Sequence, residues 1–302
     1  MGALNTPLRY PGGKQKIAPF ITELLEENDL CGINYIEPYA GGAGVAISLL
    51  LGKKVKTIHL NDKYVPIYFF WKTLLRNPEW LCKKILLVPL TIEEWKKQKA
   101  IIRDIDNNTV EDIGFATFYL NRCNRSGIIG GGVIGGLNQN GNWKIDARFS
   151  RKNLIARIEA IANLSASIKI TKYDAEALFL IISKSKQTSF IYCDPPYVSK
   201  GEKLYLNHYI KKDHKRISEK IQLNLTNAYW AVSYDYNDYI DELYNARKKF
   251  VYKLQYNASK AYLGQELFIF SDNLKVPKKS VLPQIDSGIR NYMEEFKCSL
   301  LQ

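Results

Sequence analysis

The chain has 302 residues, of which 46% are hydrophobic and 24% charged, a balance typical of a soluble folded protein. Its 43 lysines and arginines against 30 acidic residues give a net charge of +13, which favours a polyanionic partner over a merely basic, solvated surface. No apolar run reaches the roughly 18 residues of a membrane span, and no secretory signal is visible, so we expect no membrane partner.

The cysteines and histidines exclude two other classes of site. The five cysteines are scattered and odd in number, without a C-x-x-C pair, so neither a disulfide framework nor a zinc site is indicated. The three histidines show no metal spacing. We therefore predict a protein without a metal centre, in the reducing cytoplasm.

A loop over residues 6–14 comes first in the chain order. It holds two prolines and ends in Gly12-Gly13-Lys14, which lacks the G-x-x-x-x-G-K-[ST] spacing of an ATP phosphate loop. A tight turn with a solvated lysine is the plain alternative. Apolar residues at helical spacing then predict a helix over residues 16–27.

A nucleotide-binding pattern follows this helix. Residues 35–39 are typical of a strand, residues 40–44 of a glycine turn, and a helix begins near Val45. A second strand over residues 57–60 ends in Asn61-Asp62, about 20 residues past the glycines, where an acidic side chain binds ribose hydroxyls. The pattern fits NAD or S-adenosylmethionine (SAM). Because the turn is not G-x-G-x-x-G, SAM is preferred.

Residues 66–164 interrupt the strand–helix alternation. Helices are predicted over residues 66–76, 92–103, 113–122 and 154–162. Between the last two lies a long glycine-rich segment with side chains suited to phosphate and base-edge contacts. A long solvated loop is the alternative interpretation. The candidate DNA-binding residues of this region are Arg122, Asn124, Arg125, Asn138, Gln139, Lys144 and Arg148.

Alternation resumes after the insertion. Strands are predicted over residues 168–171, 189–193 and 228–233, helices over 175–183, 213–224 and 236–244, and a closing, partly antiparallel hairpin over 250–256 and 266–270. The fold class is therefore α/β, a mostly parallel Rossmann-like sheet with an antiparallel closing strand and a helical insertion. We assign residues 1–65 and 165–275 to a catalytic domain, 66–164 to a target-recognition insertion, and 276–302 to a tail.

The strand over residues 189–193 ends in Asp194-Pro195-Pro196-Tyr197. Ligands of open α/β sheets bind at the carboxyl edge of the strands. A carboxylate and the Pro195 carbonyl can each accept one N–H of an exocyclic amine on a flat base, while the Tyr197 ring stacks on that base. An Asp-Pro turn after a core strand is the alternative.

Several segments together resemble the Dam-type, alpha-group DNA adenine-N6 methyltransferases, over roughly residues 8–274. They occur in that family's order. The motif over residues 194–197 begins with an aspartate, and in this it resembles the motif of enzymes that methylate the amino group of adenine. The segments are Arg9-Tyr10-Pro11-Gly12-Gly13-Lys14, residues 37–44, Leu60-Asn61-Asp62, Tyr119-Leu120-Asn121-Arg122 and Asp194-Pro195-Pro196-Tyr197.

The resemblance implies a role for each matching residue. Asp62 would hold the ribose of SAM, and Asp174, after the third strand, the adenine amine of the cofactor. Asp194 and the Pro195 carbonyl would hold the target N6, beside the cofactor, with Pro196 and Tyr197 completing the catalytic motif. The residues assigned to the amino-acid and methionine end of SAM are Tyr10, Lys14, Glu37, Pro38, Tyr39, Gly41, Gly42 and Gly44.

The chain also departs from this family. Members that recognise GATC carry an Asn-Gly-Arg pattern where this chain has Cys123-Asn124-Arg125-Ser126-Gly127, so GATC recognition is not carried over. Many relatives have an aromatic residue where this chain has Ala175. The resemblance implies double-stranded DNA as the partner and leaves a companion restriction endonuclease open. The sequence does not reveal the oligomeric state, and we take a monomer as the default. The alternatives are an RNA or protein amine methyltransferase, an inactive DNA-binding relative and, more distantly, a nicotinamide dehydrogenase.

Overall fold

The computed structural model describes residues 6–9, 14–197, 209–226, 228–257 and 261–277. They form a seven-stranded sheet in the order β3-β2-β1-β4-β5-β7-β6. The strands β1 to β5 run parallel, and β7 is antiparallel to both β5 and β6. The predicted fold class, a mostly parallel Rossmann-like sheet with an antiparallel closing strand, is confirmed. The strands are β1 Asn34–Glu37, β2 Thr57–Asn61, β3 Ile168–Thr171, β4 Ser189–Cys193, β5 Tyr229–Asp235, β6 Lys248–Asn257 and β7 Ala261–Phe270.

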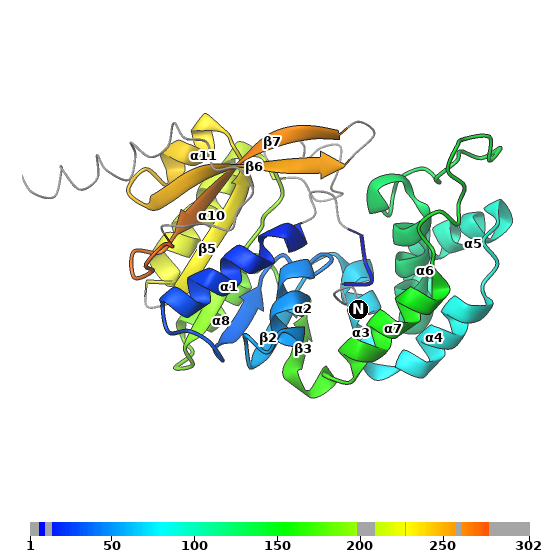
Figure 1. The fold of residues 1–302 in the computed structure, drawn as a ribbon, viewed down its shortest axis with the longest axis horizontal. Helices are drawn as coiled ribbons and strands as arrows, with labels where there is room; N and C mark the ends of the chain where they lie inside the picture. Colours follow the sequence, from blue (N-terminus) through cyan, green and yellow to red (C-terminus); the bar gives the residue numbers. More distant parts are fainter. Residues whose placement is uncertain (1–5, 10–13, 198–208, 227, 258–260, 278–302) are drawn as a thin grey trace, which may run out of the picture.

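Helices cover the sheet and fill the insertion (Figure 1). Those of the sheet half are η1 Lys14–Ile17, α1 Ala18–Glu27, α2 Gly44–Leu51, α8 Ala175–Ser183, α10 Lys211–Asn224 and α11 Asp238–Leu243. Those of the insertion are α3 Val65–Arg76, α4 Pro78–Leu87, α5 Ile92–Arg103, η2 Ile105–Asn107, α6 Val110–Cys123, η3 Arg125–Gly127, α7 Arg151–Ala162 and η4 Ser165–Ser167. Within the described ranges, no helix is both long and apolar enough to cross a lipid bilayer.

The two faces of the sheet follow from strand alternation. On one face Tyr35 and Phe190 pack in the same core cluster as Phe20 of α1. On the other, Ile36 and Ile191 pack in a second cluster with residues of α8, α10 and α11. Because neighbouring side chains of a strand point to opposite faces, a central parallel strand covered on both faces is buried along its whole length, as β4 is.

The insertion leaves the sheet after β2 and returns at β3, and its helices α4 to α7 gather at one end of the molecule (Figure 1). Helices α3 and α6 pack closely at Gly114. A Cβ at this glycine would lie 2.7 Å from the Phe69 carbonyl oxygen and 2.4 Å from Thr73 Oγ1. Helix α4 is absent from the sequence prediction. The division into a catalytic domain and a recognition domain stays a prediction.

Candidate active site

The Asp194-Pro195-Pro196-Tyr197 motif lies at the carboxyl end of β4, next to β5. Strand β4 pairs with β5 in parallel, with Cys193 opposite Val232, and this register places Asp194 beside Ser233. Ser233 Oγ donates a hydrogen bond to Asp194 Oδ1 at 2.9 Å. The same Oδ1 lies 3.2 Å from Lys14 Nζ. The motif therefore presents its carboxylate at the predicted sheet edge.

A second carboxylate, Glu266 of β7, stands in the same cluster. Its Oε2 is 2.5 Å from Lys14 Nζ, and its Oε1 accepts a hydrogen bond from the Tyr197 hydroxyl at 3.1 Å. Glu266 is fully buried. Sequence reasoning missed it, although its i+2 relation to Phe268 on β7 places it on the inward face of that strand.

Charge in this cluster is concentrated and shielded from water. Burial raises the pKa of Asp194, although the Lys14 ammonium and the Ser233 hydroxyl act against it. Burial likewise raises the pKa of Glu266 to about 7. Burial would lower the pKa of Lys14, but Asp194 and Glu266 together raise it well above its ordinary value. Lys14 is therefore a permanent ammonium held between two carboxylates.

The resemblance assigns Lys14 to the amino-acid end of SAM, and the structure places its Nζ against the Asp194 carboxylate. Its Nζ also donates to Ser233 Oγ at 3.0 Å and lies 5.3 Å from the centre of the Tyr197 ring. A direct contact between Lys14 and the cofactor stays a prediction. Tyr10, assigned to the same end, lies outside the described residues.

The glycine turn after β1 is held by Asp62. Gly41 has a φ of +46°, and Ala43 a φ of +48°, so the turn passes twice through the left-handed region before α2 begins at Gly44. The Gly41 N–H donates to Asp62 Oδ2 at 2.8 Å, and the Tyr64 N–H to Oδ1 at 2.9 Å. Burial raises the pKa of Asp62 to about 6. Asp62 thus fixes the turn, and each oxygen keeps capacity for one more donor.

Glu37 lies beneath the start of α2. Its Oε1 accepts from the Ala46 N–H at 2.9 Å and from the Tyr35 hydroxyl at 3.2 Å, and burial raises the pKa of its carboxyl to about 8. The next residue, Pro38, offers its carbonyl to Asn61 Nδ2 at 2.9 Å. These contacts place Glu37, Pro38 and the glycine turn together at the edge of β1.

Asn61 joins three strand ends, a role that sequence analysis did not assign. Besides the Pro38 carbonyl, its Nδ2 donates to the Tyr173 carbonyl at 3.0 Å, and its Oδ1 accepts from the Tyr173 N–H at 2.8 Å. The side chain is fully buried. It therefore fixes the segment that carries Asp174 against the ends of β1 and β2.

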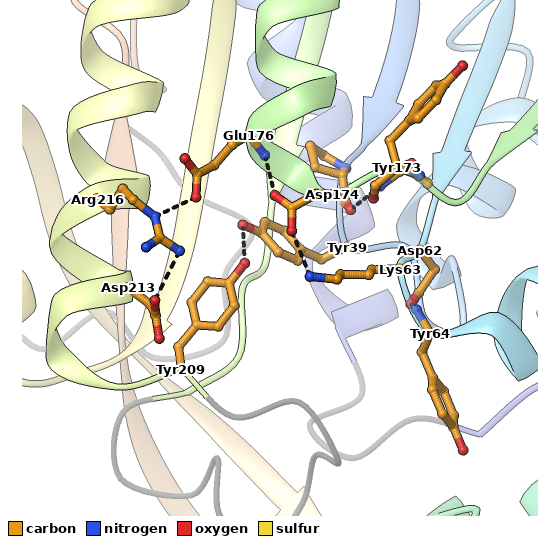
Figure 2. A network of polar contacts seen from close by, with 12 residues as sticks. Tyr39, Asp62, Lys63, Tyr64, Tyr173, Asp174, Glu176, Tyr209, Asp213 and Arg216 are labelled. Atoms are coloured by element: carbon orange, nitrogen blue, oxygen red, sulfur yellow. Dashed lines mark hydrogen bonds and ion pairs between the residues drawn. The ribbon is translucent and has the colours of Figure 1, made fainter.

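Asp174 caps α8 and carries a half-exposed carboxylate (Figure 2). Its Oδ1 accepts from the Glu176 N–H at 3.0 Å, and its Oδ2 lies 2.8 Å from Lys63 Nζ. Burial alone would raise the pKa of Asp174, but Lys63 and the helix cap lower it. Figure 2 shows Tyr39 beside this group, with its hydroxyl 3.2 Å from that of Tyr209.

Two candidate DNA-binding residues of the insertion serve its own loop. Asn124 is fully buried: its Nδ2 donates to the carbonyls of Ile128 and Ile129 at 2.8 and 2.9 Å, and its Oδ1 accepts from Trp95 Nε1 at 2.7 Å. Gln139 Nε2 donates to two loop carbonyls, and its Oε1 accepts from the Ile145 N–H. Their amides are occupied within the chain, so we do not carry them forward as direct contacts.

Arg122 is likewise engaged within the protein. Its guanidinium donates to the carbonyls of Arg148 and Pro7. Burial, together with the nearby cation of Arg9, lowers its pKa to about 9. We therefore treat Arg122 as a support of the loop.

The remaining candidates face outward. Arg125, Asn138, Lys144 and Arg148 are exposed, and the Arg148 guanidinium lies 5.7 Å from the centre of the Trp143 ring. Trp143 is 67% exposed, which is unusual for the largest side chain. These five side chains are called the exposed loop set below.

Asn121 links the insertion to the beginning of the chain. Its Oδ1 accepts from the Arg9 N–H at 2.7 Å, and its Nδ2 donates to the Arg9 carbonyl at 2.6 Å and to the Gly127 carbonyl at 2.8 Å. Gly127 has a φ of +77°, and a Cβ there would lie 2.7 Å from the Arg9 carbonyl oxygen. Arg9 is thus attached to the end of α6 and to the turn that follows it.

The sheet order, with β7 antiparallel between β5 and β6, is that of the SAM-dependent methyltransferase fold. The family model of the D12 class N6 adenine-specific DNA methyltransferases matches residues 10–260 of this chain, and the chain belongs to this family. It is therefore an adenine-specific DNA methyltransferase.

Individual relatives are more distant. The type II methyltransferase M.MjaIII of Methanocaldococcus jannaschii is 26% identical over 219 residues, which are 68% of this chain and 73% of the relative. Among solved structures, the rRNA methyltransferase AviRa of Streptomyces viridochromogenes is 11% identical and has a TM-score of 0.38, with 90% of this chain and 92% of that chain covered.

Proposed function

We propose that this enzyme binds SAM across the ends of β1, β2 and β3. The adenine that it methylates at N6 flips out of double-stranded DNA and binds beside Asp194. The single observation that carries the proposal is the largely buried Asp194 carboxylate, whose side chain is 14% exposed and is held through Oδ1 by Lys14 and Ser233. An oriented carboxylate beside a proline carbonyl suits an exocyclic amine with two N–H donors.

The chemistry of the strand-edge residues fits SAM. Three acidic side chains follow three successive strands in the sheet, and SAM carries an ammonium, a ribose diol and an adenine amine that each offer a donor. We assign the ammonium end to Glu37 with Pro38, Tyr39 and the turn of Gly41, Gly42 and Gly44. We assign the ribose hydroxyls to Asp62 and the adenine amine to Asp174, whose exposed carboxylate can exchange Lys63 for a ligand donor.

At the reaction centre, SAM when bound supplies a methyl group made electrophilic by its sulfonium. Asp194 and the Pro195 carbonyl accept the two N6 protons of the target adenine and direct the nitrogen lone pair toward that methyl group. As the N–C bond forms, N6 becomes positive, and the Asp194 carboxylate stabilises this charge. In the same step the methyl–sulfur bond breaks with its electron pair left on sulfur, and one N6 proton then passes to solvent by way of the Asp194 carboxylate that accepts it. Correct alignment provides most of the rate enhancement.

The adenine cannot reach this position while stacked in a duplex, so it must flip out at a cost of a few kcal/mol. The exposed loop set is the surface we assign to DNA. Its arginines and lysine suit phosphate contacts, while Asn138 suits a base edge and Trp143 a base face. Tyr197 stacks on the flipped adenine.

The test is incubation with labelled SAM and unmethylated genomic DNA, followed by mapping of modified adenines by single-molecule sequencing. We expect N6-methyladenine at one recurrent short sequence, which also reveals the specificity. Asp194→Ala is the control and should give no modification. SAM binding without DNA modification would transfer the proposal to an RNA or protein amine, and RNA competition would separate these. Absence of SAM binding would favour an inactive DNA-binding relative.

A further inference from the structure

Glu266 contacts both groups that flank the reacting carboxylate. Through Oε2 it binds the Lys14 ammonium, and through Oε1 it accepts from the Tyr197 hydroxyl. Its contact with Lys14, at 2.5 Å, is shorter than the 3.2 Å contact of Lys14 with Asp194. Lys14 is therefore drawn mainly to Glu266.

The charges explain why a second buried carboxylate is useful. Lys14, Asp194 and Glu266 together carry one positive and two negative charges, a net charge of −1 when all are ionised. Without Glu266, Asp194 and Lys14 would form an ion pair with no net charge beside N6. With Glu266 ionised, the cluster stays anionic where N6 gains positive charge, in a site from which water is largely excluded.

Geometry adds a second role. Within the described residues, the contacts of Asp194 to Lys14 and to Ser233 both use Oδ1. We therefore assign Oδ2 to the N6 amine of the target adenine. Tyr192 supports this orientation, because its hydroxyl lies 2.7 Å from Ser233 Oγ. Glu266 binds the Lys14 ammonium through Oε2, and through Oε1 it accepts from the Tyr197 hydroxyl and so orients the Tyr197 ring.

We propose that Glu266 is a positioning residue for methyl transfer: its charge draws Lys14 from Asp194, so that Asp194 Oδ2 remains a full anionic acceptor, and its second oxygen orients Tyr197. This inference rests on the proposed adenine-N6 transfer. It assigns Glu266 no contact with the adenine or with SAM.

The pH dependence follows from the ionisation of Glu266. Its pKa, raised by burial to about 7, means that Glu266 takes up a proton as the pH falls through this value, and the charges of Lys14, Asp194 and Glu266 then sum to zero. The methylation rate should fall on the acid side of about pH 7. The titratable groups that face Glu266 are Lys14, Asp194, Tyr197, Tyr252 and, opposite it in register, Asp235.

The experiment compares Glu266→Gln, Glu266→Asp and the wild type in single-turnover methylation of a mapped DNA site from pH 5.5 to about 8.5. Glutamine keeps the shape and removes the charge: its oxygen accepts from Lys14, and its amide N–H donates to the Tyr197 hydroxyl, which reverses the direction of that hydrogen bond. We expect a rate about 100-fold lower for glutamine at neutral pH, with the acid-side fall near pH 7 lost. SAM and DNA dissociation constants should stay within about threefold.

Aspartate separates charge from packing. It keeps the charge on a shorter side chain, so our proposal expects the aspartate variant to be faster than the glutamine variant and to retain an acid-side fall. A glutamine variant as fast as the aspartate variant, or one that keeps the wild-type pH profile, overturns the proposal. The comparison of the two variants holds even where both lose stability.

Asp272→Asn is the matched acid-to-amide control, because Asp272 follows β7 and pairs with Arg247 at the surface. Its rate and pH profile should equal those of the wild type. A wild-type enzyme that methylates no adenine contradicts the proposed function itself. An active wild type with an unaffected Glu266→Gln variant contradicts only the role of Glu266.

Discussion

Replacement of Asn124 by alanine tests whether this residue supports the loop or contacts DNA. The change leaves the buried Trp95 Nε1–H without an acceptor and the Ile128 and Ile129 carbonyls without their donor. An unsatisfied buried group costs about 1–3 kcal/mol, and these carbonyls can regain part of their bonding from water. We expect a loss of about 2–4 kcal/mol in the free energy of unfolding.

The assay is urea unfolding together with a thermal melt, in which this loss corresponds to about 4–10 °C in Tm. Asn138→Ala is the control, since Asn138 is exposed and its replacement should leave stability unchanged. DNA affinity should fall in both variants. In Asn124→Ala the cause is disorder of the loop, and in Asn138→Ala it is the loss of a contact with DNA. Wild-type stability of Asn124→Ala, together with weakened DNA binding, would refute our assignment.

The remaining predictions concern the cofactor, the reaction and DNA. Asp194→Ala should abolish methyl transfer and leave SAM binding weaker but measurable by calorimetry; normal turnover would refute its role. Asp62→Ala should raise the Kd for SAM by about 10–100-fold through loss of the ribose acceptor and the turn, and an unchanged Kd would contradict this. Because the pKa of Asp62 is about 6, SAM binding by the wild type should weaken as the pH falls through 6, when the carboxylate takes up a proton, and a flat profile would argue against it. Arg125→Ala, Lys144→Ala and Arg148→Ala should each reduce the salt dependence of DNA binding by about one charge, and an unchanged slope would exclude phosphate contact by that residue.

Much of the fold could be predicted from the sequence, because the parallel strands are short apolar runs that end at turn residues. The boundaries of β3, β4, α5 and α8 were predicted as they are found. Helix α4 was missed although Pro78 is a favourable first residue, since only Leu81 and Ile85 of this helix are buried and its periodicity is weak. The closing strands extend beyond their prediction because the β6–β7 pairing continues through polar residues.

The site was only partly predictable. Motifs identified Asp194 and the carboxylates at strand ends, which are local in the sequence. Glu266 and Ser233 join Asp194 only through strand pairing, and a single glutamate within an apolar strand gives little sequence signal. In the insertion, a polar side chain that supports a loop has the same sequence signature as one that contacts DNA. For this reason Asn124 and Gln139 were predicted to contact DNA, although the structure shows their amides bonded within the loop.

The attachment of Arg9 to Asn121 sets a mechanical limit on the enzyme. Arg9 is held by the insertion, and Lys14 by the two carboxylates of the reaction centre. Four residues lie between these anchors, so the chain from Arg9 to Lys14 has five Cα-to-Cα steps and spans at most about 18 Å when fully extended. The end of α6 therefore cannot move farther from Lys14 than this length of chain allows without breaking one anchor. Under our proposal, a pull on the insertion by bound DNA would act on the Lys14 ammonium beside Asp194.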